Sequence, residues 1–227
     1  MPDTAPRWTR HFISRVERTR TTWKLRVLLL SVPVIGLWLT SAWWTAAIGR
    51  GLVCQQHVVP SDAILIENFE PDYFLFERAR HLRDAGIAPR VLVPVYTNPS
   101  RETSSAVALG LTRMIALMSR IGSIEIIPIG LVEPISLNAA RDVSAFAKRS
   151  GIRSVVVVAP LFRSRRSALV YSSVLASSGA VVGCDPVPGD RSPTTWTNDW
   201  HGIQDVIEQS VKLWYYRLYV LPFNSSS

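Results

Sequence analysis

Two kinds of hydrophobic pattern divide the chain. An uncharged, mostly apolar stretch of 22 residues runs from Val27 to Ile48, and at 1.5 Å per residue a helix of that length crosses a hydrocarbon core of about 30 Å. From residue 61 onward, short apolar runs alternate with amphipathic stretches, as in domains built from alternating strands and helices. The pattern predicts one transmembrane helix followed by an α/β domain.

Five apolar runs in the second part are predicted strands, and the amphipathic stretches between them are predicted helices. Together they predict a three-layer Rossmann-like domain with a mainly parallel five-stranded sheet. The fourth run contains four consecutive valines, which indicates a central strand covered on both faces. The predicted strands are Ala63–Ile66, Arg90–Val95, Ile124–Ile129, Ser154–Ala159 and Ala180–Gly183. The predicted helices are Asp72–Ala85, Thr103–Ile121, Asn138–Ser150, Arg163–Ser177 and Gly202–Tyr219.

The same pattern sets the expected domain boundaries. Residues 1–26 form a basic cytoplasmic tail, residues 27–48 a transmembrane anchor and residues 49–60 a connection. Residues 61–220 form the α/β domain, and residues 221–227, which end in three serines, form a disordered carboxyl terminus.

The net charge of +8 lies mostly before the apolar stretch. The first 50 residues hold 8 basic and 2 acidic residues, and the other 177 hold 17 basic and 15 acidic residues. Seven basic residues precede the span and only Arg50 closely follows it, which predicts a cytoplasmic amino terminus and an extracytoplasmic domain in the inner membrane. A basic tail next to a span suits anionic membrane lipid, so we expect lipid and not nucleic acid as its partner. A buried core helix and a cleaved signal peptide stay open as alternatives.

The sequence lacks the motifs of nucleotide binding, of serine hydrolases and of zinc hydrolases. There is no glycine-rich phosphate loop, no nucleophile elbow and no pair of histidines at ligand spacing, so no metal site is expected and any cofactor stays undetermined. Cys54 and Cys184 either form a disulfide in an oxidising compartment or are two separate small apolar residues.

Ligands of open parallel sheets bind at the carboxyl ends of the strands, so the residues after each strand are candidates for a site. Arg163 and Arg166 open the helix after the fourth strand, where guanidinium groups and free amides suit phosphate or carboxylate. Arg165 is expected to point about 200° away into solvent. Alternatively, all three arginines are a solvated helix face. The full candidate set is Asp62, Asn68, Asn98, Glu133, Ser136, Asn138, Arg163 and Arg166. As an alternative to a site, Ser136 and Asn138 form only a helix cap, and Glu133 only forms an ion pair with an arginine.

The order of several segments resembles the bacterial envelope family of YdcF, SanA and ElyC-like proteins. SDAILI with FERARHLRDAGIAPRVLV resembles its opening strand, helix and second strand, and EPISLNAARDVSAFAKRSGIRSVVVVAP resembles its central turn, helix and strand. LFRSRRSALVYSSVL resembles its H-x-R-R-A segment, and TTWTNDWHGIQDVIEQSVKLWYYRL resembles its Trp-containing loop and last helix. The resemblance covers most of residues 61–219 and implies that Asp62, Ser136 and Arg166 are kept as site residues.

The chain departs from that family at the two glycine turns, where it has Glu67–Asn68–Phe69 and Tyr96–Thr97–Asn98. Asn138 and Arg163 occupy functional positions with changed chemistry, because the family's acidic residue is lost and its histidine aligns with Arg163. The resemblance implies an envelope protein of cell-wall or surface-polysaccharide biogenesis that binds or acts on a phosphate-bearing intermediate. The alternative is a non-catalytic anion-binding or scaffold protein with a degenerate site, so whether the protein is an enzyme stays open.

Overall fold

The structure is a computed structural model that describes residues 22–67, 69–97 and 102–224. The chain divides between Ala42 and Trp43 into two compact units. Most of the basic tail, residues 1–21, lies outside the described residues.

The first unit contains helix α1, Trp23–Leu39, which includes Pro33 and has no buried residue. The predicted single helix through Ile48 is wrong, because α1 ends and a second helix, α2, spans Ser41–Leu52. Between them, the Thr40 hydroxyl donates a 2.8 Å hydrogen bond to the Gly36 carbonyl, and such local bonds compete with helix continuation. Neither helix alone is long and apolar enough to cross a membrane, and the two pass that test of length and composition only together, as a bent pair.

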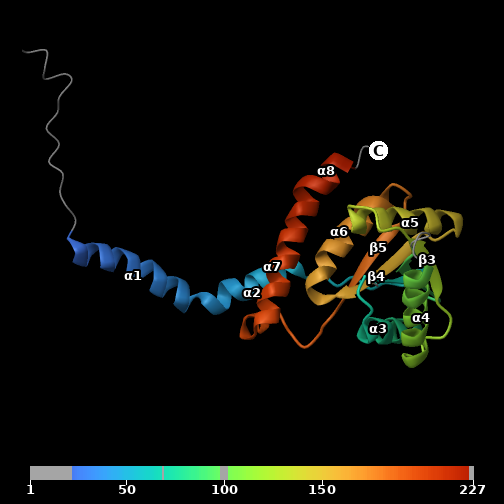
Figure 1. The fold of residues 1–227 in the computed structure, drawn as a ribbon, viewed down its shortest axis with the longest axis horizontal. Helices are drawn as coiled ribbons and strands as arrows, with labels where there is room; N and C mark the ends of the chain where they lie inside the picture. The colour runs from blue at the N-terminus through green and yellow to red at the C-terminus, as the bar shows by residue number, and fades with distance from the viewer. Residues whose placement is uncertain (1–21, 68, 98–101, 225–227) are drawn as a thin grey trace, which may run out of the picture. The chain divides into compact units, whose positions relative to one another are not determined.

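The second unit is an α/β domain with a five-stranded, wholly parallel sheet (Figure 1). The strand order is β3-β2-β1-β4-β5, the arrangement of Rossmann-like folds, so the predicted fold class of the α/β domain is confirmed. The strands are β1 (Ala63–Ile66), β2 (Arg90–Tyr96), β3 (Glu125–Ile129), β4 (Ser154–Pro160) and β5 (Val181–Val187).

Helices cover both faces of the sheet. On one face pack α3 (Tyr73–Asp84) and α4 (Glu102–Met118), and on the other α5 (Ile135–Arg149) and α6 (Ser164–Ala176). Val155 and Val157 belong to the core of the α5–α6 face, and Val156 and Val158 to that of the α3–α4 face. All four valines are fully buried, as the prediction of a central strand requires.

Two elements run several residues beyond their predicted ends. β5 continues to Val187 because Arg78 neutralises its buried Asp185, and because a proline is tolerated in an edge strand. The last helix, α7 (Trp200–Tyr215), continues through a π-helical turn, η4 (Tyr216–Val220), into α8 (Leu221–Asn224). The predicted disordered terminus therefore begins with a helical turn, whose first residue packs against the core.

From Trp43 onward α2 packs on the α/β domain. Its residues Ala46, Gly49 and Leu52 are buried, and the Trp196 indole donates to the Thr45 carbonyl at 3.0 Å. A Cβ on Gly49 would lie 2.8 Å from the backbone of Pro193, so only glycine fits there. The predicted connection 49–60 therefore starts inside a helix.

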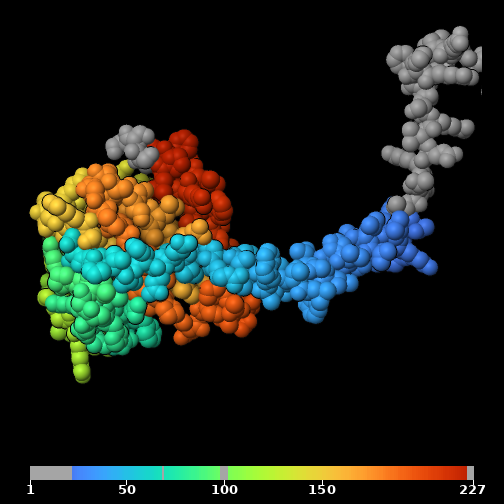
Figure 2. Space-filling view, turned by 180° about the vertical axis from the view of Figure 1, so that it is seen from behind, coloured from blue at the N-terminus to red at the C-terminus, as the bar shows by residue number. Residues whose placement is uncertain are grey.

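A disulfide fixes the connection that follows α2. Cys54 is bonded to Cys184 of β5, and His57 forms an antiparallel bridge with the same residue. The Gln56 amide donates to Asp185 at 2.8 Å. In Figure 2 this segment lies along the surface of the second unit. Of the two alternatives for the cysteines, the structure has the disulfide.

Candidate functional site

The candidate site lies at the switch point of the sheet, the place where the chain reverses its direction of strand addition. β1, β2 and β3 follow one another toward one edge, and the chain then returns to place β4 on the other side of β1. The connections that follow β1 and β4 therefore run to opposite sides of the sheet, and a crevice opens between them at the carboxyl ends of these two strands. Two pairs join these segments: Arg163 with Glu70, and Ser167 with Glu67.

A buried polar network forms the floor of the site. The Arg166 guanidinium donates to the Ser136 hydroxyl at 2.9 Å and lies 4.0 Å from the Glu67 carboxylate. The Ser167 hydroxyl donates to Glu67 at 2.6 Å. The Tyr216 ring lies 5.7 Å from the Arg166 guanidinium carbon, and its hydroxyl accepts the Ser136 amide. Glu67 is 1% exposed, so its charge needs these partners.

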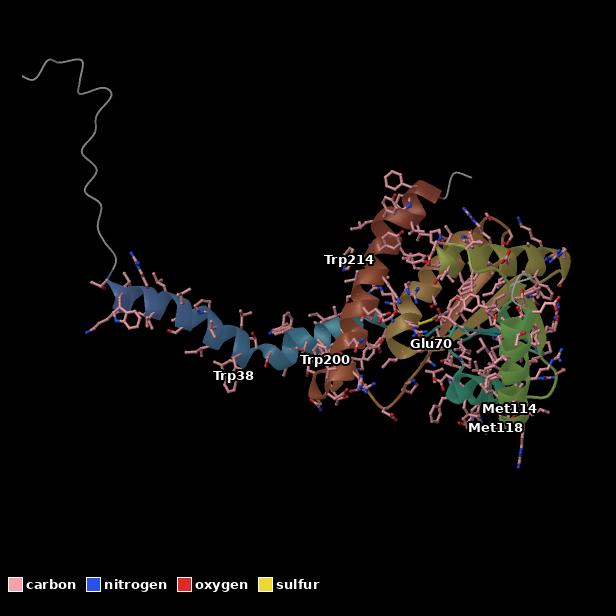
Figure 3. All side chains as sticks on the ribbon, viewed as in Figure 1. Trp38, Glu70, Met114, Met118, Trp200 and Trp214 are labelled. Carbon is pink, nitrogen blue, oxygen red and sulfur yellow. A yellow bond between two sulfur atoms is a disulfide. The ribbon has the colours of Figure 1, made fainter. Side chains whose placement is uncertain are left out.

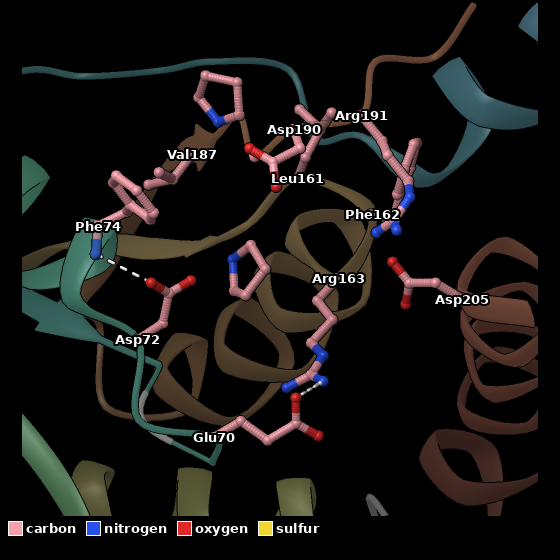
Figure 4. Close-up of a pocket in the computed structure, with 13 residues that line it drawn as sticks. Glu70, Asp72, Phe74, Leu161, Phe162, Arg163, Val187, Asp190, Arg191 and Asp205 are labelled. Carbon is pink, nitrogen blue, oxygen red and sulfur yellow. Dashed lines mark hydrogen bonds and ion pairs between the residues drawn. The ribbon is translucent and has the colours of Figure 1, made fainter. Parts of the chain in front are cut away.

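Arg163 adds a second, largely buried cation to the site. Its side chain is 14% exposed and pairs at 2.5 Å with Glu70, which is 77% exposed (Figure 4). Burial alone lowers the pKa of Arg163, but the carboxylates of Glu67, Glu70 and Asp205 outweigh burial and raise that pKa. Burial also raises the pKa of Asp205, although Arg163 opposes it. The guanidinium is therefore charged and faces a carboxylate that solvent reaches.

Two cavities meet at Arg163 and Glu70. One, of about 270 Å³, opens over the ends of β1, β4 and β5 and carries four carboxylates against two arginines. The other, of about 330 Å³, has three cationic and two acidic side chains and three tyrosines. The charged and tyrosine residues of this second cavity are Glu70, Glu133, Arg163, Arg166, Lys212, Tyr96, Tyr215 and Tyr216. Its charge balance suits an anion better than that of the first cavity.

The structure brings four of the candidate residues from the sequence together at the second cavity: Glu133, Ser136, Arg163 and Arg166. Arg165 lies outside it and is exposed, with its guanidinium donating to the Gly51 carbonyl at 2.8 Å. The expected difference between neighbouring arginines is therefore present.

The other candidates lie elsewhere. The Asn138 amide donates to the Val132 carbonyl at 3.0 Å and its oxygen accepts from Arg141, so it holds the turn before α5. Asp62 precedes β1 at the opposite edge of the sheet, where its carboxylate accepts from the Arg153 and Ser154 amides. The bond from the Arg153 amide is the main cause of its lowered pKa. Asn68 and Asn98 lie outside the described residues.

Sequence reasoning missed several residues of the site. Glu70, Asp205, Lys212 and Tyr216 reach it from segments far apart in the chain. A single sequence carries no signal that joins them. Glu67 is different, because its place directly after a predicted buried strand is a signal that the sequence itself contains.

The site is equipped to donate hydrogen bonds. Burial, reinforced by the charge of Glu67, raises the pKa of Tyr96 to about 12, so this phenol of the second cavity stays protonated at neutral pH. Burial also raises the pKa of Tyr171, which lies in the core and lines neither cavity. The Arg166 Nε group and the Tyr171 hydroxyl have no hydrogen-bond partner among the described residues. Within those residues no cluster of His, Cys, Asp and Glu could hold a metal ion. Glu67 accepts the hydrogen bond of the Ser167 hydroxyl and does not line either cavity, so the carboxylates open to a ligand in the second cavity are Glu70 and Glu133.

Comparison of the chain with protein-family models, with curated proteins and with solved structures finds no match.

Proposed function

We propose that the protein is a membrane-anchored envelope protein whose extracytoplasmic α/β domain binds a phosphate-bearing intermediate of cell-wall or surface-polysaccharide biogenesis. The ligand's phosphate lies in the second cavity, between Arg163, Arg166 and Lys212. The observation that carries this proposal is the meeting of Ser136, Arg163 and Arg166 at the switch point of the sheet.

An incoming phosphate has to compete with Glu70 for Arg163. Because Glu70 is largely exposed, this ion pair contributes about 0–1 kcal/mol and is readily exchanged. A phosphate offers three acceptor oxygens and up to two charges, so it bonds Arg163 and Arg166 together, whereas Glu70 reaches only Arg163. Glu70 therefore acts as a replaceable occupant of the anion position.

Two observations support the envelope location. The Cys54–Cys184 disulfide is typical of proteins that fold in an oxidising compartment. The apolar helix α1 has no buried residue and follows a basic tail, which suits an anchor with its amino terminus in the cytoplasm. On this proposal α1 crosses the bilayer together with the first residues of α2, up to Ala42, because α1 alone is too short, and α2 from Trp43 onward belongs to the domain.

Isothermal titration calorimetry of the full-length protein in detergent tests the phosphate site. The probes are inorganic phosphate and farnesyl diphosphate, a short soluble polyprenyl diphosphate. Arg163→Ala is expected to weaken binding of both about 10–100-fold, because a hydrogen bond to a charged group contributes about 1.5–3 kcal/mol.

Arg165→Ala is the matched control, since it removes the same charge two residues away. Its guanidinium bonds Gly51 and lies outside the cavity, so the affinity is expected to change less than about twofold. Glu70→Gln is expected to strengthen binding, and Glu102→Gln, an exposed acid on α4, is expected to leave it unchanged. Equal losses from Arg163→Ala and Arg165→Ala would show diffuse charge attraction and contradict the proposed site.

A further inference from the structure

The carboxyl-terminal helix carries apolar side chains on both of its faces. Toward the domain, Val206, Leu213, Tyr216 and Val220 are buried. On the opposite face, seven large apolar or aromatic side chains recur every three or four residues and are 48% to 71% exposed. They are Ile207, Val211, Trp214, Tyr215, Leu218, Tyr219 and Phe223, and we call them the outer face of the helix. A soluble helix normally presents polar residues on such a face.

We propose that this outer face lies on the surface of the lipid bilayer, as a second membrane contact beside the anchor. Its composition is that of an interfacial helix, because Trp214, Tyr215 and Tyr219 combine an apolar ring with a polar group. Arg217 lies 5.6 Å from the Trp214 ring and extends a cation from the same region of the helix, where it reaches lipid phosphates. The rings of Tyr215 and Tyr219 stack, and the Tyr219 ring contacts that of Phe223 at a tilt of 45°, so the three rings follow one another along the helix.

The position of α2 supports the bilayer as the occupant. Ile48 of α2 and Trp214 of α7 line the same cavity, so the outer face continues onto α2, whose Trp43 is largely exposed. Trp43 follows the last residue of α1 by only four positions, which is at most about 14 Å of chain. This step rests on the proposed anchor: when α1 is in the bilayer, Trp43 is held at the bilayer surface, with the outer face beside it.

A second exposed apolar set lies on α4 and differs from the outer face in composition. Val107, Met114, Leu117 and Met118 are exposed on α4, but this set has no aromatic residue and none of its members lines the cavity that α2 and α7 share. Figure 3 places Met114 and Met118 well apart from Trp214. Leu117 is therefore a suitable control position for the outer face.

Docking of this face brings the candidate site to the membrane. Lys212, Tyr215 and Tyr216 of the same helix line the second cavity, and Tyr215 belongs to both surfaces. The cavity then opens beside lipid headgroups, within reach of a ligand that is itself held in the membrane.

Spin labels on the full-length protein test the proposal. Single cysteines are introduced as Val211→Cys and Leu218→Cys on the outer face, Leu117→Cys on α4 and Leu30→Cys on α1. The two native cysteines form a disulfide and do not take the label. Each variant is reconstituted in vesicles of phosphatidylethanolamine and phosphatidylglycerol, and power-saturation electron paramagnetic resonance compares accessibility to oxygen, which enters lipid, with accessibility to a water-soluble nickel complex.

We expect the labels at 211, 218 and 30 to be more accessible to oxygen and the label at 117 to be more accessible to nickel. A lipid-exposed label at 30 with water-exposed labels at 211 and 218 would overturn the docking and leave the anchor in place. A water-exposed label at 30 would overturn the anchor and, with it, the docking that rests on it. If the labels at 211 and 218 are shielded from both reagents, and if the spectrum of each is broadened by the same label on a neighbouring molecule, the outer face contacts a second copy. That result also overturns the proposal.

Discussion

The buried pair of Glu67 and Arg166 is expected to couple the stability of the domain to its candidate site. Glu67→Gln keeps the shape of the side chain and its hydrogen bond with Ser167, but removes the negative charge. Arg166 then stays buried with Ser136 and the Tyr216 ring as its remaining partners. The variant therefore isolates the electrostatic part of the network.

The size of the effect follows from distance and burial. Two unit charges 4.0 Å apart attract by about 4 kcal/mol at an effective dielectric constant of 20. Removal of one partner of a buried pair typically costs about 3–5 kcal/mol, which agrees with that figure. For a protein of this size, about 4 kcal/mol corresponds to a fall in melting temperature of about 8–16 °C.

Thermal unfolding of the full-length protein in detergent, followed by circular dichroism, measures this fall. Glu125→Gln is the control, because it removes the partner of Arg90 from an ion pair on the surface and is expected to cost about 1 kcal/mol or less. The double variant Glu67→Gln with Arg166→Met removes both charges, so it is expected to melt well above the temperature that the sum of the two single losses gives. A Glu67→Gln variant that melts within about 2 °C of the wild type, or a double variant whose losses simply add, would refute the coupling.

Four further predictions concern topology, core, disulfide and pH. A carboxyl-terminal alkaline phosphatase fusion is expected to be active and a green fluorescent protein fusion dark, and the reverse would overturn the orientation. Val156→Asp is expected to prevent folding, whereas Val181→Asp on the exposed edge of β5 is expected to leave a cooperative melt. Replacing Cys54 and Cys184 by alanine is expected to lower the free energy of unfolding by about 2–5 kcal/mol, measured in urea; an unchanged midpoint would show that the disulfide does not form. Because the pKa of Tyr96 is raised to about 12, its contribution to stability is complete below pH 10 and is lost as the pH rises through about 12. Tyr96→Phe is therefore expected to reduce the fall of the melting temperature with pH over that range.

The sequence predicts the layout of the domain because each strand has a local signature. The four valines of β4 are hydrophobic at every position, which only a strand covered on both faces satisfies, and the sheet places them there. The meeting of Ser136, Arg163 and Arg166 was predictable for a related reason. Parallel strands deliver the segments that follow them to one edge of the sheet, whatever their separation in sequence.

Other features depend on contacts that no local pattern contains. At the break after α1 the Thr40 hydroxyl bonds the Gly36 carbonyl of the preceding turn, a local contact that a hydropathy profile does not register. The end of β5 resembles a loop because of Asp185, whose partner Arg78 lies 107 residues away. Asn138 has an amide that could bind a ligand, but this amide donates to the backbone carbonyl of Val132, six residues earlier. Glu70 and Asp205 reach Arg163 only through the tertiary fold.

The central claim is that a phosphate-bearing ligand occupies the cavity at Arg163. Native mass spectrometry of the full-length protein, released from membranes in mild detergent, identifies the small molecules that it retains. The account predicts a retained molecule that contains phosphate, is kept by the Arg165→Ala variant and is lost from the Arg163→Ala variant. A retained molecule without phosphate, or a phosphate-bearing one that Arg163→Ala keeps as well as the wild type does, would contradict it.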